Sequence, residues 1–108
     1  MDPPTDQAVT RDLHRLVERL QHDFGPCQVI LFGSRARGTH LLTSDADILV
    51  VASAFEGMRE DDRMIRVLER WNGPVSLQPL CYTPAEFEAR RHGINIVEVA
   101  VREGRTLA

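Results

Sequence analysis

The chain reads LFGSRARG at residues 31–38 and DADILVV at residues 45–51. The first stretch completes an apolar, β-branched run over residues 28–32, which predicts a buried strand that stops at Gly33. Gly33 allows a close approach of the backbone, and the residues after it can open a short helix whose unpaired N–H groups face an anion. We expect Gly38 to cap that short helix. The turn therefore predicts a phosphate-binding site.

Polar side chains of this turn are candidate phosphate ligands. Ser34 offers a hydroxyl, and Arg35 and Arg37 offer guanidinium groups that match a phosphate in charge. Residues two apart in a helix face different directions, so we expect only one of the two arginines to reach the site. His40 lies between the turn and Asp45 and is a further candidate, although scattered histidines are more often surface residues.

Asp45 and Asp47 form the second half of the pattern. In an extended strand, residues two apart project from the same face, so these carboxylates lie side by side. Their mutual repulsion is relieved when a hard divalent cation such as Mg²⁺ lies between them and beside phosphate oxygens. Residues 48–51, which follow, are apolar on both faces and predict a central strand of a sheet.

A Gly-Ser turn, ten intervening residues and an Asp-x-Asp strand together resemble the signature of the nucleotidyltransferase superfamily that includes DNA polymerase β. In so short a chain, the pattern is similar to the minimal nucleotidyltransferases, and the likeness extends over most of residues 1–108, which we interpret as a single domain. The resemblance implies a mixed α/β (α+β) fold of the polymerase β palm type, in which helices flank a small mixed β-sheet.

The resemblance also implies an activity, the transfer of a nucleoside monophosphate from a triphosphate to an acceptor hydroxyl. The favoured nucleotide substrate is ATP, from which AMP is transferred and pyrophosphate leaves. Two Mg²⁺ ions are expected to assist the transfer. By motif position, Gly33 and Ser34 would bind the phosphates, and Asp45 and Asp47 would bind metal and act in catalysis. Minimal members often work with a small helical protein of the HEPN type, some as toxin–antitoxin pairs. The resemblance therefore implies that such a partner, or a second copy of this chain, supplies part of the surface that binds the acceptor.

One part of the family pattern is missing from this sequence. Active members usually carry a third carboxylate on the strand expected at residues 74–82, where Ser76 and Gln78 occupy the alternate positions. Glu86 and Glu98 are acids that could substitute, although nothing in their spacing favours either. Two functions therefore stay open: a Mg²⁺-dependent transferase, and a catalytically degenerate nucleotide-binding module that masks or regulates a partner protein.

Composition narrows the function further. The chain has 108 residues, 27% of them charged and 43% hydrophobic, with a formal net charge of −3. This is an ordinary globular balance, and its acidic excess gives no overall attraction to polyanions, so we expect no template nucleic acid. Nucleotide transfer to aminoglycosides is disfavoured, because those enzymes usually have a second domain.

Further sequence features bear on the compartment. Residues 1–4 are acidic and turn-forming, so we expect no signal peptide, and no apolar run is long enough to cross a membrane. Cys27 and Cys81 are expected to be small buried residues rather than a disulfide. These features predict a cytoplasmic protein.

Hydrophobic periodicity predicts two longer helices. The first covers residues 5–24 and ends near Gly25, and the second covers residues 57–71. The apolar side of the second helix is expected to contain Met64, Ile65, Leu68 and Trp71.

The C-terminal part gives one clear signal and one conflict. Thr83 and Pro84 form a strong helix start. Residues 94–101 are β-branched and favour a strand by propensity, whereas the resemblance implies a helix closed by Gly104 and a short extended end. We expect the helix, because packing often overrides propensity.

Overall fold

The computed structural model describes residues 5–108, and the expectation for residues 1–4 lies outside that range. A four-stranded sheet forms the centre of the fold, in the order β3-β2-β1-β4. β1 runs antiparallel to β2 and β4, and β2 runs parallel to β3, so the expected mixed sheet is confirmed. The strands are β1 (Cys27–Phe32), β2 (Ala46–Ala52), β3 (Leu77–Tyr82) and β4 (Arg105–Thr106).

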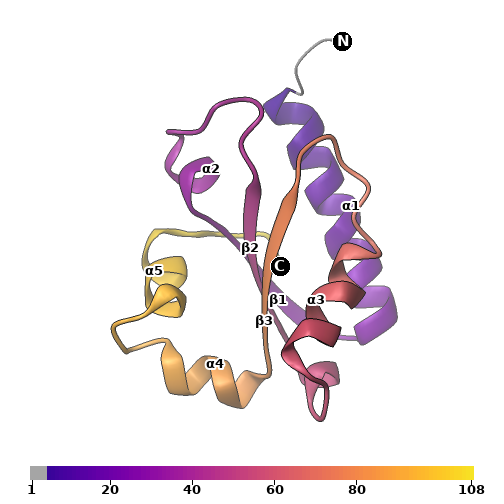
Figure 1. Ribbon diagram of the computed structural model, residues 1–108, viewed down its shortest axis with the longest axis vertical. Helices are drawn as coiled ribbons and strands as arrows, with labels where there is room; N and C mark the ends of the chain where they lie inside the picture. The colour runs from indigo at the N-terminus through magenta and orange to yellow at the C-terminus, as the bar shows by residue number, and fades with distance from the viewer. Residues whose placement is uncertain (1–4) are drawn as a thin grey trace.

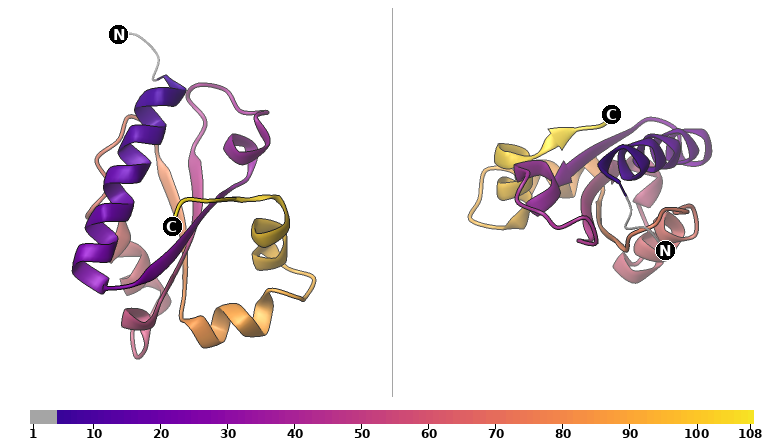
Figure 2. Two further views of the ribbon diagram at one scale, coloured as in Figure 1. Left: turned by 180° about the vertical axis from the view of Figure 1, so that it is seen from behind. Right: turned by 90° about the horizontal axis from the view of Figure 1, so that it is seen from above.

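Helices cover both faces of this sheet. Figures 1 and 2 show α1 and α3 on one side of the strands and α4 and α5 on the other. The helices are α1 (Asp6–Phe24), α2 (Ser34–Arg37), α3 (Glu60–Leu68), α4 (Pro84–Arg90) and α5 (Ile96–Glu103), with a short 3-10 turn η1 (Ser53–Phe55) after β2. Among residues 5–108, no helix combines the length and the apolar character needed to cross a membrane.

β2 is the central strand, as its sequence predicts. Ile48 and Val50 are fully buried in the cluster under α1 and α3, whereas Leu49 and Val51 belong to the cluster under α4 and α5. Each large apolar side chain that is fully buried in this way contributes about 1.5–3 kcal/mol to stability. The same alternation directs Asp47 toward the α4–α5 face, because it is two residues before Leu49.

α1 confirms the first predicted helix. The Thr5 hydroxyl accepts a hydrogen bond from the Ala8 N–H and so caps the N-terminus, and Gly25 ends the helix with a φ of 77°. Leu13, Leu16 and Leu20 recur at helical spacing on its apolar side and are buried.

α3 is shorter than the predicted helix at residues 57–71. It begins three residues later, after Gly57 turns the chain with a φ of 78°. Beyond Leu68 the chain continues as tight turns, in which the Trp71 N–H donates to the Leu68 carbonyl at 3.1 Å.

The predicted apolar side of this helix is wrong for three of its four residues, whereas Trp71, in the turns after α3, is partly buried against the core. Met64, Ile65 and Leu68 are 40%, 51% and 39% exposed, and the residues buried under the helix are Arg63 and Val67. The reason is the Arg63 guanidinium, which ion-pairs with Glu86 and lies 5.9 Å from the centre of the Phe55 ring. These contacts turn the helix so that Arg63 faces inward.

The C-terminal half resolves the conflict in favour of the helix. α5 occupies most of the β-branched segment, and Asn95 caps it by accepting hydrogen bonds from the Val97 and Glu98 N–H groups. Gly104 is the C-cap of the helix and has an extended backbone. Only glycine fits there, because a Cβ would collide with Ile30 and with the Ala100 and Leu31 carbonyls. The expected short extended end is β4, which pairs with β1.

The two cysteines form no disulfide, as expected. Both are half-buried rather than buried, and burial raises the pKa of the Cys81 thiol to about 12.

Glu86 links α4 to α3 and makes the fold sensitive to acid. Hydrogen bonds from Arg63 and from the Thr83 N–H hold the pKa of Glu86 at about 2, below its usual 4.5. A lowered carboxylate pKa stabilises the fold above about pH 4.5, and that stabilisation is lost as the pH falls toward 2.

We expect Glu86→Gln to lower the free energy of unfolding by about 1–2 kcal/mol at pH 7, and by less at pH 3. Urea denaturation at both pH values measures the difference. Glu88→Gln, on the exposed side of α4, is the matched control and should cost less than about 0.5 kcal/mol. An equal loss in the two variants would contradict this role of Glu86.

Candidate functional site

The Gly-Ser turn and the aspartate pair meet at one end of the sheet. β1 and β2 are antiparallel neighbours, and Phe32, the last residue of β1, lies opposite Asp47. Gly33 therefore leaves the sheet beside the start of β2. Figure 1 shows α2 at this upper end and α4 at the opposite, lower end. The antiparallel register thus brings together the two halves of the sequence pattern.

Gly33 touches the Asp47 carboxylate. Gly33 has a φ of 74° and a ψ of −156°, a combination that is nearly restricted to glycine. A Cβ at this position would lie 2.5 Å from Oδ2 of Asp47, so no side chain fits between them. The turn backbone and the carboxylate thus form a single narrow cradle.

The electrostatics of this cradle favour a cation. Burial raises the pKa of Asp47, and the charge of Asp45 raises it further, whereas Arg37 lowers it. The exposed Asp45 carboxylate and the half-buried Asp47 carboxylate repel each other, and a divalent cation would neutralise their charge. Asp45 and Asp47 are therefore the residues that could hold a metal ion.

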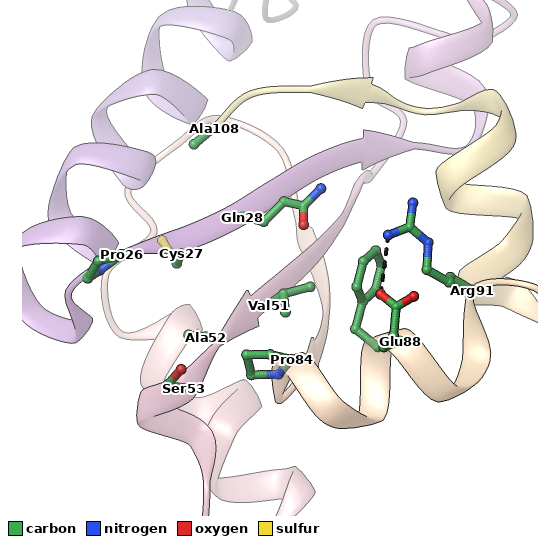
Figure 3. A pocket seen from close by; sticks show the side chains of 11 residues that line it. Pro26, Cys27, Gln28, Val51, Ala52, Ser53, Pro84, Glu88, Arg91 and Ala108 are labelled. Carbon is green, nitrogen blue, oxygen red and sulfur yellow. Dashed lines mark hydrogen bonds and ion pairs between the residues drawn. The ribbon is translucent and has the colours of Figure 1, made fainter.

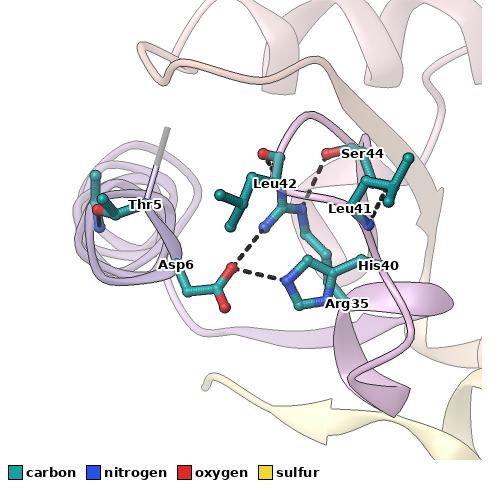
Figure 4. A network of polar contacts seen from close by, with 8 residues as sticks. Thr5, Asp6, Arg35, His40, Leu41, Leu42 and Ser44 are labelled. Carbon is teal, nitrogen blue, oxygen red and sulfur yellow. Dashed lines mark hydrogen bonds and ion pairs between the residues drawn. The ribbon is translucent and has the colours of Figure 1, made fainter. Parts of the chain in front are cut away.

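Arg35 has other partners, as Figure 4 shows. Its guanidinium donates from Nε to the Ser44 carbonyl at 3.0 Å and from Nη2 to the Leu42 carbonyl at 2.9 Å. It also ion-pairs with Asp6 at 3.4 Å, and the same Asp6 oxygen lies 2.7 Å from Nε2 of His40. These contacts tie the loop at residues 38–45 to the start of α1.

Arg35 and His40 therefore hold the loop in place, and we leave both out of the candidate phosphate site. The Arg35 side chain is only 4% exposed, and its bonds to backbone carbonyls would be lost if it turned to a ligand. His40 is likewise directed at Asp6.

Arg37 is the arginine on the aspartate side. Its side chain is 48% exposed, and its charge acts on Asp47. Nη1 lies 3.5 Å from Oε2 of Glu103, at the end of α5. Sequence reasoning missed Glu103 because it lies 66 residues after Arg37 and no local pattern connects them. Arg37 is therefore a side chain that a phosphate could draw from a weak ion pair.

The neighbouring strand supplies no acid to this site. In the parallel register of β2 and β3, Gln78 lies opposite Asp47, and the Ser76 carbonyl accepts a hydrogen bond from the Ala46 N–H at 2.9 Å. Among residues 5–108, no three His, Cys, Asp or Glu side chains gather closely enough to hold a metal ion.

The two acids named as possible substitutes, Glu86 and Glu98, have other partners in the structure. Glu86 binds Arg63 and follows the far end of β3, and Glu98 pairs with Arg102 at 2.8 Å. Gln78, the register partner of Asp47, is four residues before Tyr82, the last residue of β3. These four residues of strand span about 13 Å and separate Asp47 from the end of β3 that leads to Glu86.

A separate cavity of about 640 Å³ lies at that far end, between α4 and the start of β1 (Figure 3). Gln28 and Val51 line it, and they are opposite one another in the β1–β2 register. Its two charged lining residues, Glu88 and Arg91, pair with each other at 3.4 Å. The cavity therefore has no geometric connection with the aspartate pair.

The fold is that of a nucleotidyltransferase domain. Residues 13–99 match the family described as "Nucleotidyltransferase domain", and the chain belongs to that family. A search of curated proteins finds no match.

Solved structures agree with this fold. The chain is similar to "a putative nucleotidyltransferase from Sulfolobus solfataricus", with a TM-score of 0.62 and 29% identity over 81% of this chain and 86% of the other. It shares its fold with a crystal structure of "the toxin-antitoxin with AMP-PNP", with a TM-score of 0.54 and 22% identity over 88% of this chain and 72% of the other.

The contact between Gly33 and Asp47 can be measured against a matched glycine. Gly25 has nearly the same backbone angles, with a φ of 77° and a ψ of −157°, but no atom lies within 4 Å of its would-be Cβ. We expect Gly25→Ala to cost about 1–3 kcal/mol of unfolding free energy from backbone strain alone. Gly33→Ala should cost more, because the new methyl group collides with Asp47. Equal losses in thermal or urea unfolding would show that the contact is absent.

The two arginines of α2 should differ in the same measurement. Arg35→Met keeps the side-chain volume but removes the bonds to the loop carbonyls, so we expect a loss of about 2–3 kcal/mol. Arg37→Met removes only a half-exposed ion pair and should cost less than about 0.5 kcal/mol. A larger loss for Arg37→Met than for Arg35→Met would overturn the assignment of Arg35 to the scaffold and Arg37 to the site.

Proposed function

We propose that this domain transfers a nucleoside monophosphate, AMP from ATP above all, to an acceptor hydroxyl. The observation that carries the proposal is the close approach of Gly33 to the Asp47 carboxylate, which supports the prediction of a phosphate-binding turn beside a metal-binding acid. Membership of the nucleotidyltransferase domain family supports it.

The nucleotide would bind along this turn. The Gly33 backbone, the Ser34 hydroxyl and the Arg37 guanidinium would contact the phosphates, because Arg37 is exposed and close enough to act on Asp47. The narrow cradle and the all-carboxylate donor pair fit Mg²⁺, which Asp45 and Asp47 would hold. Bound there, Mg²⁺ would supply charge neutralisation for the phosphates and the leaving group.

The proposed reaction is a simple substitution at phosphorus. The acceptor oxygen bonds to the α-phosphorus, and the bond from that phosphorus to the oxygen bridging to the β-phosphate breaks. Pyrophosphate leaves with the electron pair, and the hydroxyl proton passes to water. The domain's own residues contribute by fixing the triphosphate in line with the acceptor.

For the acceptor we propose a hydroxyl on a partner protein of the helical HEPN type, as in a toxin–antitoxin pair. The alternative is self-association, in which a second copy of this chain would supply part of the acceptor-binding surface. The fold shared with a toxin–antitoxin structure that contains AMP-PNP supports this choice. The requirement for ATP agrees with a cytoplasmic setting.

A second candidate function rests on a different observation. Gln78, a neutral residue, lies beside Asp47 on the neighbouring strand. A domain that binds nucleotide but lacks a further acid could mask or regulate a partner without turnover. Transfer of label distinguishes the two functions.

The test uses ATP labelled at the α-phosphate, with Mg²⁺ and lysate of the source organism or purified candidate acceptors. We expect label on an acceptor, and a loss of about 100- to 1,000-fold in rate for Asp45→Asn and for Asp47→Asn. Asp62→Asn, an exposed acid on α3, is the matched control and should keep the wild-type rate.

The outcomes separate the hypotheses. No label above the aspartate variants, with folded protein that still binds nucleotide, would reject transfer and leave the binding module. Failure of the folded protein to bind any nucleoside triphosphate would reject both.

A further inference from the structure

The number of cations that this site can hold is limited by residues on two neighbouring strands, β2 and β3, and by Asp45 just before β2. Asp45 and Asp47 project from β2 and the segment before it, and Gln78 on β3 is the register partner of Asp47. Neighbouring strands lie about 4.8 Å apart, so Gln78 is the next side chain along the same face. Its amide oxygen carries no formal charge and is a weaker ligand for a hard cation than a carboxylate.

The local charges also limit the site. Two carboxylates together carry the charge of one divalent ion, and Arg37 already acts as a positive group on Asp47. A second cation would find no further carboxylate on β2 or β3 and would have to rely on the triphosphate oxygens alone.

The acid that contacts Arg37 is already paired. Glu103 accepts the Arg37 ion pair at 3.5 Å. No group of three metal-binding side chains exists within residues 5–108. Neither Glu103 nor any other acid of that range completes a second ligand set.

We infer that this domain holds a single divalent cation, between Asp45, Asp47 and the bound triphosphate, and that Gln78 occupies the place from which a carboxylate would hold a second. The inference rests on the proposed nucleotide site and deepens it. It makes the domain a one-ion site.

The test is native mass spectrometry of the full chain with Mn²⁺ and α,β-methylene ATP, in which the bond that would break is replaced. We expect one Mn²⁺ in each wild-type complex with nucleotide. Gln78→Glu changes an amide to a carboxylate of the same shape and should yield complexes with two, the second bound about 10- to 100-fold more tightly than to the wild type.

The control is Gln28→Glu, which adds the same charge to the same face of the sheet at its far end. We expect this variant to keep one ion. Gln78→Asp provides a second variant with a shorter side chain, and circular dichroism confirms folding.

Two results would overturn the inference: two ions on the wild-type complex, or a single ion on both Gln78 variants when they fold and bind nucleotide. A folded wild-type protein that takes up no nucleotide would instead reject the proposed function, and this inference with it.

Discussion

The antiparallel pairing of β1 with β2 is the constraint on which the site depends. It places Phe32 opposite Asp47, so the chain must leave β1 within touching distance of the carboxylate. Only a glycine with a positive φ can make that exit, because a Cβ would occupy the space of Oδ2 of Asp47. Burial of β2 on both faces fixes the register, since a slip of one residue would move Asp47 into the cluster under α1.

Two buried arginines, Arg35 and Arg63, stabilise the loops and helices around the β1–β2 pair. Arg35 holds the loop between the turn and the aspartates by donating to two of its carbonyls. Arg63 connects α3 to α4 through Glu86, at the opposite end of the sheet. Each is a buried charge whose partners lie on other elements, so each stabilises a particular packing of elements rather than a helix by itself.

Local patterns predicted the parts of the structure that depend on neighbours in sequence. The first strand, the glycine turn and the second strand followed from residues 28–51, although β2 begins at Ala46 and leaves Asp45 just before it. The capped start of α4 followed from Thr83 and Pro84. α5 required the family resemblance, because its β-branched residues favour a strand and the capping role of Asn95 was not recognised. The prediction of the buried face of α3 was wrong because that face depends on the Arg63–Glu86 ion pair, whose members are 23 residues apart in the sequence. The division of roles between Arg35 and Arg37 likewise depends on Asp6 and Glu103, which no short pattern connects to the turn.

The most direct measurement is a crystal structure of the protein with α,β-methylene ATP and Mn²⁺, with the metal located by its anomalous scattering. We expect the triphosphate to bind along Gly33 and Ser34, and the anomalous peak of Mn²⁺ to lie between Asp45 and Asp47. A nucleotide in the cavity beside Gln28 and Arg91, or a metal away from the aspartates, would contradict it.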